Sequence, residues 1–145
     1  MASRRWRIAL CVAIFGGVDV YADEAAHDYL LYCSGCHRDD GSGSAVNQVP
    51  PLPGSVGNFV HTAAGRAFLI QIAGVAQTPL GDAALARLMN WLLARFGAAE
   101  LPADFKPYTG DEVARYRATR PADQSAQRAS VVAELARRGM SVAHY

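Results

Sequence analysis

The pentapeptide Cys33-Ser34-Gly35-Cys36-His37 decides how the rest of this chain is interpreted. Two thiols separated by two residues can reach one edge of the same porphyrin, and the histidine that follows can turn beneath its centre. Two thioether bonds to the vinyl groups of a haem, together with a proximal histidine ligand, need this set of side chains. The pattern therefore predicts one covalent haem c, attached through both cysteines, with the histidine as a ligand of the iron.

Other sites built on paired cysteines fit the sequence less well. A structural zinc site or an iron-sulfur cluster needs about four ligands, and the chain has no second pair of cysteines. A thioredoxin-like dithiol belongs in a βαβ setting, whereas the flanks here have helical patterns. A structural disulfide is chemically possible in an exported protein, but it would leave His37 without a role.

The first 22 residues have the composition of an export signal. Three arginines precede an apolar run at residues 8–18, and Ala22 ends a small-residue cleavage site. The run is shorter than the roughly twenty residues that span a bilayer. We therefore expect residues 1–22 to be removed as the protein enters the periplasm, with an uncleaved membrane anchor as the alternative.

Composition and charge exclude several classes of protein. The 145 residues include 14 Lys+Arg and 13 Asp+Glu, and 51% are hydrophobic. This balance excludes a strongly basic nucleic-acid-binding protein and a highly charged disordered chain. The third cysteine, Cys11, lies in the expected signal, so the processed chain keeps only the pair in the pentapeptide.

Hydrophobic periodicity predicts an all-α protein. The strongest pattern covers residues 82–96, where apolar side chains recur at helical spacing between Asp82, a candidate cap, and Gly97, a candidate stop. A capping-box pattern, Thr109 followed by Glu112, predicts another helix further along. The remaining expected helices run from Asp23 into the pentapeptide, over residues 62–74, and from about Pro121 to Arg138.

With these features the chain resembles the class I c-type cytochromes over residues 23–97. The resemblance implies a small cytochrome c fold with helices around one haem, and it leaves residues 98–145 as a helical C-terminal extension. It also implies that the carbonyl of Pro50 accepts the Nδ1 proton of His37, while Leu52 packs against the haem. A proline-rich surface loop is the alternative for this segment.

The sixth iron ligand of the family is missing. The family carries a methionine in the loop before the last core helix, whereas residues 74–80 contain none. One candidate is His61, whose alternative is a surface-loop histidine. Another is Met89, although its place within the apolar pattern of residues 82–96 also fits a gap-filling core residue. An open distal position is the third possibility.

Two functions follow from these expectations. The resemblance implies a periplasmic monohaem electron carrier, not an enzyme, with redox proteins such as a dehydrogenase and a terminal oxidase as donor and acceptor. The missing methionine supports the alternative of a haem protein whose open or displaceable distal site binds or senses a small gas. A peroxidase-like activity is least favoured. The arginines of residues 98–145 predict solvated helix faces or a basic docking patch.

Overall fold

The computed structural model describes residues 18–143, and every regular element within that range is helical. These elements are α1 (Val18–Tyr32), α2 (Ser34–His37), η1 (Val56–His61), α3 (Ala63–Gln71), α4 (Ala73–Ala76), α5 (Asp82–Phe96), η2 (Ala98–Glu100), α6 (Gly110–Ala118) and α7 (Gln124–Arg137). The prediction of an all-α protein is confirmed. Most of the expected export signal, residues 1–17, lies outside the described range. None of the described helices is long and apolar enough to cross a membrane.

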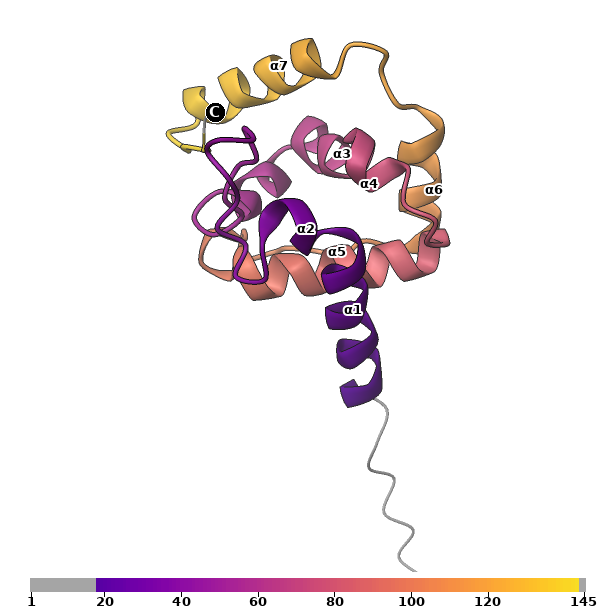
Figure 1. Cartoon of the computed structure of the whole chain (residues 1–145). Coiled ribbons are helices and arrows are strands. Elements are labelled where there is room, and N and C mark those ends of the chain that lie inside the picture. The colour runs from indigo at the N-terminus through magenta and orange to yellow at the C-terminus, as the bar shows by residue number, and fades with distance from the viewer. Residues whose placement is uncertain (1–17, 144–145) are drawn as a thin grey trace, which may run out of the picture.

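The described helices lie along two opposite sides of the molecule and between them (Figure 1). In Figure 1, α5 runs along one side, α7 runs along the other, and α3 and α4 lie between them. Helix α1 packs across α5, and α6 packs on both α5 and α3. The C-terminal residues therefore return to the side of the molecule that carries η1 and α3.

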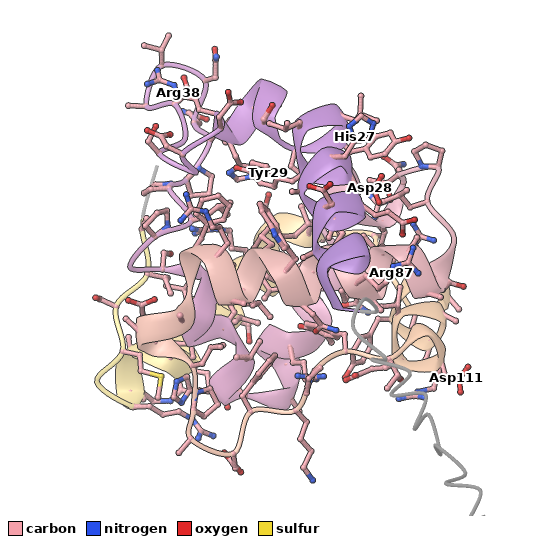
Figure 2. All side chains as sticks on the ribbon, turned by 90° about the horizontal axis from the view of Figure 1, so that it is seen from below. His27, Asp28, Tyr29, Arg38, Arg87 and Asp111 are labelled. Carbon is pink, nitrogen blue, oxygen red and sulfur yellow. The ribbon has the colours of Figure 1, made fainter. Side chains whose placement is uncertain are left out.

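An aromatic cluster fixes α1 on α5. The ring of Tyr29 is buried, with its centroid 5.5 Å from that of Trp91 and 5.2 Å from that of Phe96. Its hydroxyl donates a hydrogen bond to the carbonyl of Arg38, 2.7 Å away, and Figure 2 shows the side chain pointing that way. Since Tyr29 precedes the cysteine motif and Arg38 follows it, this contact also closes the turn that carries the motif.

The start of α1 and the N-cap of α5 differ from those predicted. Helix α1 begins at Val18, not at Asp23, because the intervening residues include no glycine or proline that would stop it. Helix α5 ends at Phe96 as predicted, but it begins one residue early, at Asp82, because its N-cap is Gly81. The carboxylate of Asp82 instead accepts a hydrogen bond from Arg117 of α6.

The helix predicted over residues 62–74 is divided in two. Helix α3 ends at Gln71, Ile72 has φ −54° and ψ 136°, and α4 begins at Ala73. The side chain of Gln124 from α7 accepts a hydrogen bond from the N–H of Ala73 at 3.0 Å and donates one to the carbonyl of Gln71. An amide from the C-terminal extension thus satisfies backbone groups at the break.

The extension has the two predicted helices. The Thr109 hydroxyl caps α6 by accepting from the N–H of Glu112 at 3.2 Å. Helix α7 begins at Gln124, later than the predicted Pro121, because Asp123 caps it. The extension is not a separate unit, since its buried apolar side chains join the same hydrophobic cluster as those of α1, α3 and α5. Those side chains are Tyr108, Val113, Val131, Leu135 and Val142.

Candidate cofactor site

The two cysteines of the motif line one cavity together with His37. Both are free thiols, Cys33 half-buried and Cys36 exposed. Burial raises the pKa of the Cys33 thiol to about 11, with smaller contributions from Asp28 and Cys36. A thiol that stays protonated at neutral pH is a poor redox nucleophile. Within the described residues no group of three or more His, Cys, Asp or Glu side chains could hold a metal ion.

The imidazole of His37 has the environment of a ligand held in place. Its Nδ1 lies 3.1 Å from the carbonyl oxygen of Pro50, so the predicted hydrogen bond is present. A carbonyl can only accept, and this bond therefore keeps the proton on Nδ1 and leaves the lone pair on Nε2. Burial lowers the pKa of His37, although the hydrogen bond to Pro50 opposes the shift. The side chain is thus a neutral imidazole, the form that binds iron.

Gly43 allows the Pro50 carbonyl to lie within hydrogen-bond distance of His37. Gly43 has φ +70°, a conformation that side chains disfavour. A Cβ atom there would lie 2.3 Å from the carbonyl oxygen of Val49 and 2.8 Å from that of Pro50. The N–H of Gly43 donates to the carbonyl of His37 at 3.0 Å. The loop of residues 44–50 can therefore fold back onto the histidine only because this position lacks a side chain.

The cavity has a volume of ≈ 380 Å³, and its walls are mainly apolar. This size lies within the range of cofactor sites, which is about 300–1,000 Å³. Leu52, which is 8% exposed, lines it as the resemblance implied. The other apolar walls come mainly from η1, α3, α4 and α5, through Val56, Phe59, Phe68, Leu69, Val75, Leu85, Leu88, Met89 and Leu92. An apolar cavity with two thiols and a neutral imidazole fits a covalently attached haem.

The structure does not bring His61 to this cavity. His61 ends η1, and its Nε2 lies 2.6 Å from the carbonyl oxygen of Glu100. The backbone of η1 lies close to the residue before η2, since a Cβ on Gly57 would lie 2.4 Å from the oxygen of Gly97. This packing turns His61 towards η2, and His61 is not among the described residues that line the cavity.

Met89 does line the cavity. Its side chain is 3% exposed and lies on the apolar face of α5, between Leu85 and Leu92 along the chain. Among the described lining residues it is the only methionine, and His37 is the only histidine. Met89 therefore stays a candidate ligand as well as a core residue.

Arg117 of α6 binds the loop where the family carries its methionine. One terminal nitrogen donates to the carbonyl of Leu80 at 2.9 Å and to the carboxylate of Asp82 at 2.8 Å. The other donates to the carbonyl and the hydroxyl of Thr78, at 3.1 and 3.0 Å. Thr78 itself lines the cavity. The sequence pattern indicated a solvated or docking arginine here, because nothing local shows that its partners lie more than thirty residues earlier.

Arg128 of α7 also lines the cavity. Its terminal nitrogen donates to the carbonyl of Ala143 at 2.7 Å. The sequence pattern did indicate that Arg128 lies on the apolar face of its helix, since Arg128, Val131 and Leu135 recur at helical spacing. In the structure the two apolar residues of this set are buried. An arginine on the buried face of an amphipathic helix is a candidate for an interior role.

Comparison with known proteins finds c-type cytochromes. A cytochrome c-552 from Thermus thermophilus is 28% identical over an alignment 130 residues long. The alignment covers 77% of this chain and 86% of that protein. Another cytochrome c-552 from Thermus thermophilus is 30% identical over 104 residues, covering 59% of this chain and 79% of that protein. No protein-family model matches the chain.

The alignment with the first of these relatives reaches into the C-terminal extension. Residues 1–97 make up about two thirds of the 145 residues, whereas the alignment covers 77% of the chain. It must therefore include part of residues 98–145, although the motifs that carry the resemblance lie within residues 23–97. This agrees with the single hydrophobic cluster that joins the extension to the rest of the molecule.

Proposed function

The chain belongs to the family of c-type cytochromes, and from this premise we propose that it is a periplasmic monohaem electron carrier. The observation that carries the proposal is the pair formed by His37 Nδ1 and the Pro50 carbonyl, 3.1 Å apart. It lies beside two free thiols, Cys33 and Cys36, that line the same apolar cavity. Covalent haem attachment accounts for all of these features together.

The roles of the residues follow from their chemistry. When bound, a haem c supplies a one-electron couple between ferric and ferrous iron. Cys33 and Cys36 hold it through thioether bonds, and His37 ligates the iron through Nε2. The Pro50 carbonyl positions the imidazole and increases its basicity through the Nδ1 hydrogen bond. The apolar walls exclude water and so favour the form of lower charge, which raises the reduction potential.

The exposure of the motif suits exchange with partner proteins. Cys36 is exposed, and next to the motif Leu31 and Tyr32 are 60% and 39% exposed. A haem held at Cys36 would thus be accessible to a docked protein, as weak redox encounters require. We propose a periplasmic dehydrogenase as donor and a terminal oxidase as acceptor, by analogy with other small cytochromes.

A potentiometric titration tests the carrier function. The absorption of the purified protein should follow a one-electron Nernst curve with full reversibility, and a chemical reductant should deliver one electron per chain. A transition with more than one electron, or a reduced form that cannot be reoxidised by a small-molecule oxidant, would contradict this function.

Mass spectrometry of the processed protein tests its location, and we expect Asp23 as the first residue. A first residue of Met1 would favour the membrane anchor.

A second function is favoured by the lining of the cavity. Residues 74–80 contain no methionine, and the described lining holds no histidine besides His37. Among the described lining residues outside the motif, Met89 and Tyr32 are the side chains of types that serve as haem ligands. A haem here would have an open or displaceable distal position, where a small gas such as carbon monoxide or nitric oxide could bind. The carbon monoxide experiment described below tests whether that position is open.

A further inference from the structure

One part of the otherwise apolar cavity is polar, and the C-terminal extension builds it. Arg128 of α7 and Ser55 both line the cavity. Both also bond to Ala143, whose carbonyl accepts from Arg128 at 2.7 Å and whose N–H donates to the Ser55 hydroxyl at 3.0 Å. Because one residue bonds to both side chains, they must lie close together.

Both side chains have hydrogen-bonding capacity left over. A guanidinium has five N–H donors, and the contacts of Arg128 with the described residues use only the one directed to Ala143. No carboxylate in the described part of the chain forms an ion pair with it. Ser55 is 4% exposed and uses its oxygen as an acceptor, so its hydroxyl proton is free to be donated. A cation and a hydroxyl donor beside an apolar cavity suit a carboxylate ligand.

We infer that Arg128 and Ser55 bind a carboxylate of the haem. This inference rests on the proposed haem attachment. A haem has two propionate carboxylates on the edge away from the vinyl groups that the cysteines modify. An apolar cavity that takes up such an edge must neutralise it, because an unpaired carboxylate is costly to bury. The extension would then form part of the cofactor site and not a separate appendage.

A guanidinium at this place also affects the redox couple. Reduction lowers the positive charge of the iron centre. A carboxylate without a counter-charge opposes reduction, because its negative charge stabilises the more positive ferric form. Arg128 offsets that charge, so its removal should favour the ferric form. Helix α7 would in this way set the reduction potential from outside the core helices, through a single side chain.

Replacing Arg128 by glutamine tests the inference. We expect R128Q to carry one haem but to shift the ferric-to-ferrous ratio at fixed ambient potential about tenfold towards ferric, equal to about 59 mV for a one-electron couple. R128K retains the charge and should recover most of the shift. R137Q is the matched control, since Arg137 lies on the same helix, is exposed and does not line the cavity. Its potential should stay at the wild-type value.

A second readout covers the case in which R128Q does not fold. R128K and S55A are milder changes, and each should shift the propionate bending band in the resonance Raman spectrum, whereas R137Q should not. An unchanged band in both variants, or a loaded R128Q with the wild-type potential, would overturn the inference. A wild-type protein whose mass lacks haem would instead overturn the proposed function, so the two failures are distinguishable.

Discussion

The Nδ1 atom of His37 lies 3.1 Å from the carbonyl oxygen of Pro50, across a loop that returns to the cysteine motif. The hydrogen bond fixes the tautomer and the direction of the imidazole, and it needs the backbone of residues 44–50 to lie against Gly43. The position of the His37 imidazole, the proposed proximal ligand, is thus set by a backbone contact and not by another side chain.

Replacing Gly43 by alanine should therefore damage the site. Gly54 provides a matched control, because its φ is also +70° but a Cβ atom added there would have no neighbouring atom within 4 Å. We expect G54A to lower the free energy of unfolding by about 1 kcal/mol, the cost of the left-handed conformation. G43A should cost about 1–3 kcal/mol more through its clash with Val49 and Pro50. Urea denaturation measures both, and equal losses would contradict the role of Gly43.

Carbon monoxide tests the distal side of the haem. We expect it to change the absorption spectrum of the reduced wild-type protein, because no second histidine is available in the described cavity lining. H61A should behave like wild type, since His61 bonds to Glu100 and does not line the cavity. An unchanged wild-type spectrum would point to a strong sixth ligand. M89L would then have to gain carbon monoxide binding, because Met89 is the remaining candidate.

The loop before α5 should depend on Arg117. R117Q removes the ion pair with Asp82 and the hydrogen bonds to Leu80 and Thr78, whereas R115Q changes an exposed arginine on the same helix. We expect R117Q to lower the free energy of unfolding by about 2–3 kcal/mol, as for charged hydrogen bonds of a partly buried group. Its reduced form should also bind carbon monoxide faster, because the loop is loosened. Stopped-flow rates equal to those of R115Q would argue against this role of the loop.

Acid should weaken the attachment of α6. The Arg66 guanidinium forms two hydrogen bonds with the Glu112 carboxylate, at 2.6 and 2.8 Å, and holds the pKa of that carboxyl below its ordinary value. Because folding lowers this pKa, the ionised carboxylate stabilises the fold fully at pH values above 4.5, its ordinary pKa. This stabilisation is lost as the pH falls through the lower pKa of the folded state. The free energy of unfolding should therefore fall in acid more steeply for wild type than for E112Q.

The control for this pH dependence is E134Q. Glu134 pairs with Arg138 on an exposed part of α7, where ion pairs contribute little. Urea denaturation at several pH values below 5 should give E134Q a curve parallel to that of wild type. If E112Q also ran parallel to wild type, the Arg66–Glu112 pair would not be a source of the acid sensitivity.

Local patterns predicted those parts of the fold that depend on neighbours in the sequence. The spacing of apolar residues predicted α5 to within one residue, and the cysteine motif with the proline loop predicted the contact between His37 and Pro50. The division of α3 from α4 was not predictable in this way. It depends on the side chain of Gln124, some fifty residues further along the chain.

The candidate site, too, was predictable only where it depends on neighbours in the sequence. Its proximal side follows from the motif, whereas its other walls depend on tertiary packing. The glycine contact between η1 and η2 directs His61 away from the cavity. The path of the chain after α5 brings Arg117 and Arg128 to the interior, although a run of arginines on short helices usually indicates a solvated surface.

The intact mass of the purified protein under denaturing conditions tests the central claim most directly. If Cys33 and Cys36 bind one haem covalently, the mass should equal that of the processed polypeptide plus one haem, and the haem should stay attached when the chain is unfolded in acid. A mass equal to that of the polypeptide alone, or lower by two hydrogens as for a disulfide, would contradict the account.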